Sequence, residues 1–549
     1  SWLVATVFGP ILGKALLEPP APTEGEPKPS KLKSGYQGFL RAAIRVRWLT
    51  IGVTIAMFAA AMLALPLVPR QFFPSSDRNE LLVDLTLRQN ASIGASQATA
   101  ERVEALLNGD PDVDHYSTYV GRGAIRFYLP LSVHLANPFF SQIVVVAKSI
   151  EARERLQARL EGKLALDFPE LVSRVSPLEM GPPVGWPLQY RVTGPDKDEL
   201  RRIAEDVGKL MAADARVRNV NYDWMEPARQ LRLHIDQDEA RRLGVSTAGI
   251  AAVLQASVTG TTITQVRDDI YLVNVVARAT DSERASFDTL ASLQVATPSG
   301  RMVPMSQFAR FSEEQEFPLV WRRDRVPTLT VRADVTKGVL PESVVAQIGP
   351  SIAEYNAKLP RPYKIETGGL YESSNDSSAN VFSVVPMMIL LMLLFMMMLL
   401  ISFRRLAMVV FIMPLGLIGV VGALLLFQRP LGFVAILGIL ALIGMIAKNA
   451  VILIVSIEEE RAAGASVSDA VMTAAGNRLT PLVLTAISTV LGLIPIAPTI
   501  FWGPMAIAIM GGLLVASLLT LILLPVLYIT VFGRDDKKPP PAAPAVTAA

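Results

Sequence analysis

Long apolar runs that are nearly free of charged residues occupy two parts of the chain, and a long stretch of mixed composition separates them. The first run is Trp48–Val68. The others are Val381–Phe403, Leu406–Phe427, Phe433–Ile457, Pro481–Phe501 and Met505–Phe532. A helix needs about 20 apolar residues to cross about 30 Å of hydrocarbon. The pattern therefore predicts six transmembrane helices, one at 48–68 and five within 381–532, with a large loop between them.

Basic residues gather at the span ends that an alternating path places on one side of the membrane. These are Arg41, Arg45, Arg47, Arg404, Arg405, Arg534, Lys537 and Lys538. Short basic flanks stay in the cytoplasm, so this side is predicted to be cytoplasmic. The large loop then lies outside the cytoplasm. In a Gram-negative bacterium this is the periplasm, and the chain would be a multi-pass protein of the bacterial inner (cytoplasmic) membrane.

The two ends of the chain differ from the spans. Residues 1–17 are apolar but short and lack the basic start of a signal peptide, so they are interpreted as the end of a preceding transmembrane helix. Residues 18–47 open with a Pro- and Lys-rich stretch and are predicted to be a cytoplasmic linker. Residues 533–549 are rich in Pro and Ala and are predicted to be a disordered cytoplasmic tail.

Four segments of the large loop repeat one pattern: an alternating strand, an amphipathic helix and a second strand. They begin at Leu81, Gln142, Leu188 and Thr328. Leu200, Ile203, Val207 and Leu210 show the three- and four-residue spacing with which such a helix buries one stripe against a sheet. Two consecutive units form a ferredoxin-like split βαβ arrangement, with helices on one face of a sheet.

The repeats predict two α/β subdomains, at 69–183 and at 184–229 joined with 318–372. Residues 230–317 form an insertion with its own signals: a helix stop at Gly244, a helix cap at Ser246 and a turn at Ser299-Gly300. The predicted fold class is thus a polytopic α-helical membrane protein with six transmembrane helices, two ferredoxin-like subdomains and an inserted subdomain.

Composition narrows the possible functions. Of the 549 residues, 51% are hydrophobic and 18% charged, which excludes a disordered or nucleic-acid-coating chain. The formal charge of +3 does not indicate an acidic partner. The chain has no Cys and only three His, which excludes disulfides and Cys-ligated metals and argues against a His-rich metal site. We find no HExxH or GxSxG motif, so the sequence predicts neither an enzyme nor a cofactor.

Lys448 is a charge in the middle of a predicted span. It lies fifteen residues into Phe433–Ile457, and a charge near the centre of a lone helix costs about 2.5–3.5 kcal/mol on insertion scales. Its side chain could snorkel to the surface, or it could face the bundle interior and pair with a carboxylate. The six predicted spans contain no Asp or Glu, so such a partner would have to come from outside this chain.

Arg478 and Thr485 are seven residues apart and therefore on one helix face, about 10 Å from each other. They could simply anchor the helix and bond a backbone carbonyl. Alternatively, they could join Lys448 in a polar track through the membrane, a feature typical of proton or ion relays.

At these residues the chain resembles the C-terminal half of a resistance-nodulation-division (RND) transporter of the hydrophobe/amphiphile efflux branch. The matching stretches are FFPSSDRNEL, LEMGPPVGWPLQYRVTG, IDQDEARRLGVS, GMIAKNAVILIVSIEEERAAG and NRLTPLVLTAISTVLGLIP. The resemblance implies that the two α/β subdomains are porter subdomains and that the insertion is the docking subdomain. It also implies that the spans are helices seven to twelve of a twelve-helix bundle.

The resemblance assigns a proton relay to Lys448, Arg478 and Thr485. In this family the matching Lys pairs electrostatically with two aspartates. These aspartates lie in the N-terminal half of the pump and are absent here. The resemblance implies a homotrimeric drug/proton antiporter in the lipid bilayer, driven by the proton motive force. It also implies a periplasmic membrane-fusion adaptor and an outer-membrane channel as partners, and amphiphilic drugs or biocides as substrates.

The segment between the first two repeats occupies the place of the family's gating loop. Its aromatic residues Phe127, Tyr128, Phe139 and Phe140 are candidates for stacking on a drug, or they could pack the loop on its own subdomain.

Two alternatives stay open. A heavy-metal-exporting branch of the family uses methionines in the cleft, but Met211, Met225, Met302 and Met305 form no evident set with Met180. A protein-translocation accessory of the same superfamily would explain the half length, although the docking insertion and the surroundings of Lys448 argue against it.

Overall fold

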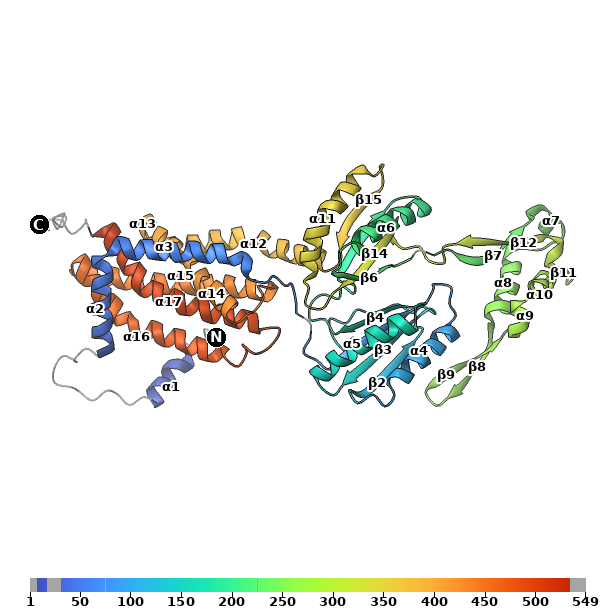
Figure 1. Ribbon diagram of the computed structural model, residues 1–549, viewed down its shortest axis with the longest axis horizontal. Helices are drawn as coiled ribbons and strands as arrows, with labels where there is room; N and C mark the ends of the chain where they lie inside the picture. The colour runs from blue at the N-terminus through green and yellow to red at the C-terminus, as the bar shows by residue number, and fades with distance from the viewer. Residues whose placement is uncertain (1–6, 17–30, 75, 225, 534–549) are drawn as a thin grey trace, which may run out of the picture. The chain divides into compact units, whose positions relative to one another are not determined.

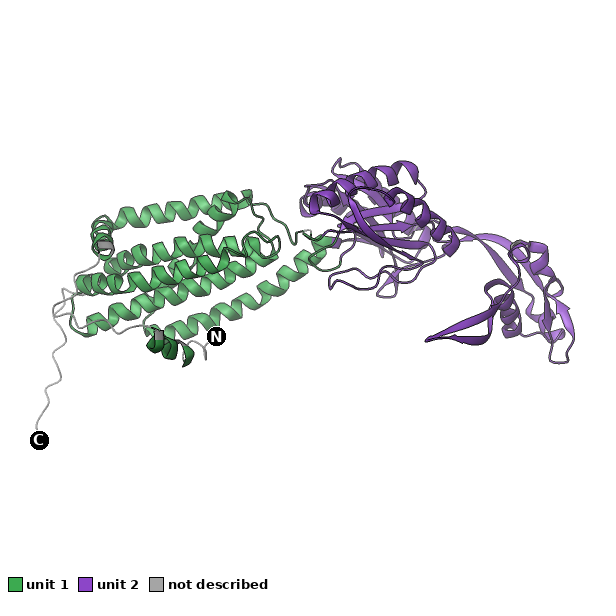
Figure 2. Cartoon of the chain, turned by 90° about the horizontal axis from the view of Figure 1, so that it is seen from below, with its two compact units in different colours: residues 1–78, 178–183, 370–549 green, residues 79–177, 184–369 purple. Residues whose placement is uncertain are grey.

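The computed structural model describes residues 7–16, 31–74, 76–224 and 226–533. The chain divides into two compact units (Figure 2). Unit 1 comprises Ser1–Arg78, Leu178–Pro183 and Leu370–Ala549, and unit 2 comprises Asn79–Pro177 and Val184–Gly369. The apolar helices thus belong to unit 1, and the α/β segments of the large loop belong to unit 2.

Unit 1 is helical (Figure 1). Its elements are α1 (Gly9–Leu16), α2 (Lys31–Arg45), α3 (Arg47–Ala64), η2 (Leu65–Leu67), α12 (Gly369–Leu400), α13 (Phe403–Ile412), η5 (Met413–Gly416), α14 (Leu417–Leu426), α15 (Phe433–Ala462), α16 (Val467–Leu493) and α17 (Gly503–Phe532). The region predicted as a linker therefore includes a 15-residue helix, α2. The tail predicted to be disordered lies outside the described residues, apart from Gly533.

Five helical stretches in the described part of the chain are long and apolar enough to cross a membrane. They are Arg47–Leu67, Gly369–Leu400, Phe403–Leu426, Phe433–Ala462 and Gly503–Phe532. The remaining prediction, a span at Pro481–Phe501, is not matched by a helix of that extent. Helix α16 begins earlier, at Val467, and ends at Leu493, and the residues up to Trp502 form turns. Asp469 and Arg478 on its first half shorten its apolar stretch.

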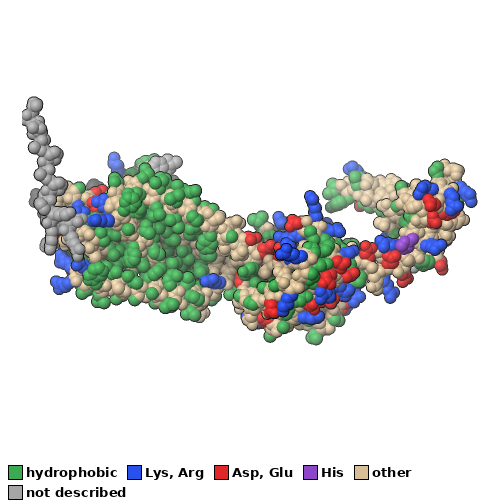
Figure 3. Space-filling model, turned by 90° about the horizontal axis from the view of Figure 1, so that it is seen from above, with side chains coloured by type: hydrophobic (Ala, Val, Ile, Leu, Met, Phe, Trp, Pro, Cys, Tyr) green, Lys and Arg blue, Asp and Glu red, His purple; other side chains and the backbone are tan. Residues whose placement is uncertain are grey.

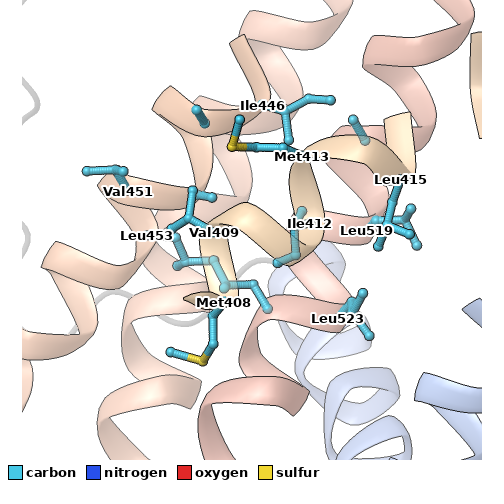
Figure 4. Close-up of a cluster of buried hydrophobic side chains, with 14 of the residues drawn as sticks. Met408, Val409, Ile412, Met413, Leu415, Ile446, Val451, Leu453, Leu519 and Leu523 are labelled. Carbon is cyan, nitrogen blue, oxygen red and sulfur yellow. The ribbon is translucent and has the colours of Figure 1, made fainter. Parts of the chain in front are cut away.

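Close contact between backbones positions α14 against α17. A Cβ on Gly419 would overlap the carbonyl oxygen of Gly511, and a Cβ on Gly511 would lie 2.6 Å from the carbonyl oxygen of Gly419. Helices in lipid gain their packing from such small residues because hydrocarbon gives no hydrophobic driving force between them. In the same unit, buried side chains of α13, α15 and α17 form one apolar core, among them Val409, Ile446 and Leu519 (Figure 4).

Other surfaces of unit 1 leave large apolar side chains uncovered. Trp48 is 70% exposed, and Leu63 and Ile401 are each 81% exposed. The space-filling view shows a broad apolar face on this unit (Figure 3). Exposure on this scale suits contact with lipid or with further protein rather than with water.

The first sheet of unit 2 comprises β1 (Glu80–Thr86), β2 (Val113–Val120), β3 (Phe140–Ala147) and β4 (Val172–Pro177). Its order is β2-β3-β1-β4, with antiparallel pairing throughout. Helices α4 (Ile93–Leu107) and α5 (Ile150–Asp167) pack on one face through residues such as Val103 and Leu156. This is the split βαβ arrangement predicted from the repeats.

A second sheet has the same order, β6-β14-β5-β15. Its strands are β5 (Leu188–Thr193), β6 (Val217–Tyr222), β14 (Val326–Val335) and β15 (Lys364–Gly368), and β13 (Arg322–Arg323) pairs with the start of β14. Helices α6 (Lys197–Ala212) and α11 (Pro341–Lys358) cover one face. The predicted stripe on α6 is buried at Leu200, Ile203 and Val207, whereas Leu210 is only partly buried.

The insertion is reached through a two-stranded ribbon, β7 (Ala228–Ile235) paired with β12 (Ala309–Glu316). Between them lie α7 (Gln237–Arg242), α8 (Thr247–Leu254), η3 (Gln255–Thr259), β8 (Thr261–Asp268), β9 (Tyr271–Ala277), α9 (Asp281–Ala285), α10 (Phe287–Ser292), β10 (Gln294–Ala296), β11 (Met302–Pro304) and η4 (Met305–Gln307). All three predicted local signals are confirmed. Gly244 and Gly300 have positive φ, and the Ser246 hydroxyl accepts the N–H of Gly249 at 3.0 Å.

Candidate functional site

Lys448 lies on the one face of α15 that other described elements leave uncovered. The exposed positions of this helix include Leu437, Ala441, Gly444 and Ile452, and they recur every three or four residues through Lys448. Its neighbours Ala447 and Asn449 are buried against the bundle. Within the described residues, the Lys448 ammonium has no hydrogen bond or ion pair. Its charge is thus presented on a helix face that the described elements leave open.

Arg478 connects α16 to the helix that carries Lys448. Its Nε donates a hydrogen bond of 2.7 Å to the hydroxyl of Ser456, which is buried on α15. Ser456 lies eight residues after Lys448, about 12 Å along the helix toward the predicted cytoplasmic end. The structure therefore brings Arg478 to the Lys448 helix, but two turns away from the lysine itself.

Thr485 is exposed, and its hydroxyl donates to the carbonyl oxygen of Pro481 at 2.8 Å. This is the local role that the sequence left open. Helices α15 and α16 pack together and are joined by a tight turn, so they run antiparallel. The Arg478–Ser456 contact gives the two helices a common level. Seven residues farther from the connecting turn, α16 reaches Thr485 and α15 reaches Asn449, next to Lys448. Thr485 thus lies at the depth of Lys448, and the relay assignment of the three residues stays a prediction.

A second polar cluster lies at the end of α15 and was not predicted from the sequence, which showed Arg405 only as a basic residue at a span end. Arg405 donates to Glu458 Oε2 at 2.7 Å and to the Leu400 carbonyl at 3.0 Å. The Tyr528 hydroxyl donates to Glu458 Oε1, and Arg461 donates to the Tyr528 oxygen at 3.1 Å. The cluster joins α13, α15 and α17. Helical spacing could have predicted the cluster. Glu458 lies four residues after the buried Ile454, so it points to the same, inner face of α15 and needs a partner there.

The helix-free faces of the two sheets in unit 2 carry polar side chains that meet each other. In the first sheet, Asp84 is directly opposite Arg174 in the strand register. Arg174 Nε lies 3.3 Å from Asp334 Oδ1 of the second sheet. The Trp186 ring contacts two guanidinium groups, those of Arg174 at 5.4 Å and Arg332 at 5.5 Å. Strand alternation predicts a polar face on each sheet, but not which residues meet across the gap.

Burial shifts the pKa values of three charged groups near this contact between the sheets, those of Asp223, Asp334 and Arg332. It raises the pKa of Asp223 to about 6, although the nearby Arg332 charge and N–H groups of Thr330 and Trp224 act in the opposite direction. Both N–H groups donate to Asp223 Oδ1, at 2.8 and 2.9 Å. Burial also raises the pKa of Asp334, against the pull of Arg174, and lowers the pKa of Arg332.

The raised pKa gives a prediction for Asp223→Asn. Because the folded-state pKa of about 6 exceeds the unfolded value near 3.9, the contribution of Asp223 to stability is full below about pH 4 and is lost as pH rises through about 6. Between pH 4.5 and 7.5, the wild type should lose about 2 kcal/mol of unfolding free energy that Asp223→Asn retains. Urea unfolding of the full chain followed by tryptophan fluorescence measures this difference, with Asp198→Asn as an exposed control. Parallel pH profiles for wild type and Asp223→Asn would refute it.

The four aromatic candidates of the first subdomain lie in different surroundings. Phe140 is 6% exposed at the start of β3 and stacks on His134 with ring centroids 4.5 Å apart. It therefore packs the loop on its own subdomain, the second of the two roles that the sequence left open. Phe127 is 40% exposed, and Tyr128 and Phe139 are half-buried. The structure does not gather the four into one stacking surface.

The described residues contain no group of three or more His, Asp or Glu side chains placed to hold a metal ion. Met211 is buried in the core of the second subdomain and Met305 in the core of the insertion, while Met302 is 51% exposed. Met225 lies outside the described residues. The two buried methionines, Met211 and Met305, thus pack the cores of their own subdomains.

The chain is similar to known proteins over nearly its whole length. A family model described as the AcrB/AcrD/AcrF family matches residues 1–532. Swarming motility protein SwrC of Bacillus subtilis (strain 168) is 24% identical over 98% of this chain and 51% of its own length. Nickel and cobalt resistance protein CnrA of Cupriavidus metallidurans is 25% identical over 94% of this chain and 49% of its own. The chain thus spans about half the length of these curated relatives.

Two crystal structures of a heavy metal efflux pump share the fold. Their TM-scores are 0.72 and 0.71, at 24% and 25% identity, and each match covers 92% of this chain and 52% of the pump. Together with CnrA, they contradict the expectation that the substrates are amphiphilic drugs, and favour the alternative of heavy-metal export. The drug interpretation also loses physical support, because Phe140 packs within its own subdomain.

Proposed function

The chain belongs to the AcrB/AcrD/AcrF family of RND transporters, and from this premise we propose that it forms the C-terminal half of a pump that exports heavy-metal cations. The observation that carries the choice of cargo is the similarity to CnrA and to a heavy metal efflux pump across more than nine-tenths of the chain. In both matches this chain covers about half of the relative. As members of a transporter family, such chains move substrates rather than convert them.

The open face of α15 supports the proposal that a second half completes the membrane domain. A lysine ammonium facing lipid is unfavourable, so Lys448 needs an anionic partner or water. The next carboxylate on that face of α15 belongs to Glu459, eleven residues and about 16 Å farther along the helix, too far to pair with Lys448. A carboxylate from the other half, placed at the depth of Lys448 and Thr485, would satisfy the charge and would form the proton-binding group.

Proton transfer at such a carboxylate would change the attraction between it and Lys448. Each proton that enters down the membrane potential supplies about 2.3 kcal/mol per 100 mV, enough to shift a two-state equilibrium. The Arg478–Ser456 hydrogen bond would make α16 follow any shift of α15. The contacts of Glu458 with Arg405 and Tyr528 would transmit it to α13 and α17.

Residues of the rest of the protein would complete the cation path, because the described residues hold no group of three or more His, Asp or Glu side chains for a metal ion. We propose that the working protein is a homotrimer in the bacterial inner membrane, with unit 2 in the periplasm. A periplasmic adaptor and an outer-membrane channel would carry the cation out of the cell, as is general for RND pumps.

Metal accumulation in living cells tests this proposal. Cells lacking the protein and cells restored with it are loaded with Ni²⁺, Co²⁺, Zn²⁺, Cu⁺ or ethidium, and cell-associated cargo is measured. At least one metal should accumulate several-fold more in the cells that lack the protein, whereas ethidium should accumulate equally. Equal metal contents combined with raised ethidium would contradict metal export. An unrelated inner-membrane protein expressed at the same level controls for membrane stress.

A further inference from the structure

An apolar groove runs between α13 and α17 on the surface of unit 1. It has a volume of about 310 Å³ and is lined by Ala407, Met408, Phe411, Leu527 and Val531, with Arg404 as its one charged residue. Phe411 and Val531 are each 39% exposed, whereas Met408 is only 5% exposed and forms the floor. The groove thus has apolar walls and one basic end, and it opens to the outside of the bundle.

Arg404 differs from its neighbour Arg405 in its partners. Arg405 is occupied by Glu458 and the Leu400 carbonyl. Arg404 is exposed, and its guanidinium has no hydrogen bond or ion pair with any described residue. Arginine binds phosphate through two parallel N–H groups, so a phosphate group is the anion that its geometry suits best.

The groove also has the length and depth expected for one leaflet. From Arg404 to Phe411, α13 rises about 10 Å, against about 15 Å for half of a 30 Å hydrocarbon core. Arg404 stands where α13 begins and Val531 where α17 ends, which the basic flanks place at the cytoplasmic side. The apolar lining therefore extends from headgroup level into the inner leaflet.

We propose that this groove binds one anionic phospholipid, with its phosphate on Arg404 and an acyl chain between α13 and α17. The volume is at the low end for small-molecule sites. A packed helix, about 10–12 Å across with its side chains, would need a wider surface. Charge complementarity favours an anionic lipid such as phosphatidylglycerol over phosphatidylcholine, whose ammonium group would be repelled by Arg404.

Native mass spectrometry of the purified complete protein tests the lipid preference. Dioleoylphosphatidylglycerol and dioleoylphosphatidylcholine are added in equal amounts to delipidated protein. The wild type should retain the anionic lipid at least about fivefold more, and Arg404→Gln should remove that preference. Arg429→Gln, which loses the same charge just beyond the opposite end of the Phe403–Leu426 helical stretch, should keep it. Equal retention of both lipids by the wild type, or an unchanged preference in Arg404→Gln, would overturn the proposal.

Two further variants separate lipid from protein as the occupant. Ala407→Phe fills the groove and should reduce retention of both lipids even though Arg404 is present. Ala407→Cys takes advantage of a chain that has no cysteine. A spin label there should be relaxed by oxygen, which dissolves in lipid, in membranes of the complete protein. A label shielded from oxygen would show that another protein segment covers the groove, which would refute lipid binding.

Discussion

Lys448→Ala in the complete protein is expected to reduce metal export to the level of cells that lack the protein. The substitution removes the charge that α15 presents on its open face, so protonation of the partner carboxylate would no longer change the packing of the helices. Membrane abundance and oligomeric assembly should remain normal, because Lys448 makes no hydrogen bond or ion pair with the described residues. Initial rates of metal extrusion, normalised to protein abundance, measure the effect.

Ile452→Ala is the matched control for Lys448→Ala. It lies one turn away on the same exposed stripe of α15 and carries no charge. It should extrude metal at close to the wild-type rate. Wild-type extrusion by Lys448→Ala at normal abundance would show that Lys448 has no part in the relay.

Gly419→Val is expected to prevent the folding of the membrane domain. Its Cβ would meet backbone of α17 rather than a flexible side chain, so relief requires the two helices to move apart. Overpacking of a tight interface typically costs 1–3 kcal/mol, and a clash with backbone lies at or above the upper end, about 3 kcal/mol. Such a loss is a large part of the total stability of a protein. Folded protein in the membrane should therefore fall at least about tenfold.

Gly422→Val is the control on the same helix. Gly422 lies three residues from Gly419 and is exposed, and its Cβ would meet no atom within 4 Å. Size-exclusion chromatography of detergent extracts should show a normal monodisperse peak for Gly422→Val and little or none for Gly419→Val. A normal peak for both would mean that the α14–α17 contact adapts to a side chain.

Much of the fold follows from local patterns. The alternation in β1 buries Leu81, Val83 and Leu85 against helices, as expected for a strand with one covered face. Gly244 ends its helix because its own backbone adopts a positive φ, and Ser246 caps the next helix by accepting the N–H of Gly249. Neither effect needs a partner that is distant in the sequence. Features of this kind are readable because their causes lie within a few residues of sequence.

Other features depend on contacts that the sequence does not show. The ion pair of Arg405 was not predicted because its partner Glu458 lies more than fifty residues away on another helix. The end of α16 at Leu493 was missed because apolar composition continues beyond it, while the chain turns toward α17. The meeting of Arg174 with Asp334 likewise depends on how two similar sheets face each other.

The site was predicted more securely than its substrate. Lys448 is singled out by the cost of a charge in lipid, and the structure places it on an open helix face, although its role in a relay stays a prediction. Aromatic residues in a loop carried no such constraint. Phe140 has a structural role in its own subdomain, so aromatic content alone could not distinguish drug from metal cargo.

Coupled transport in proteoliposomes tests the central claim most directly. The complete protein is reconstituted with an imposed pH gradient, and a pH-sensitive dye follows proton movement after Ni²⁺, Co²⁺, Zn²⁺ or Cu⁺ is added. We predict that at least one metal accelerates the dissipation of the gradient in the wild type, and that none does so in Lys448→Ala. Metal movement at the same rate with and without the gradient, or dissipation caused by amphiphilic dyes but by none of the metals, would contradict a proton-driven metal pump.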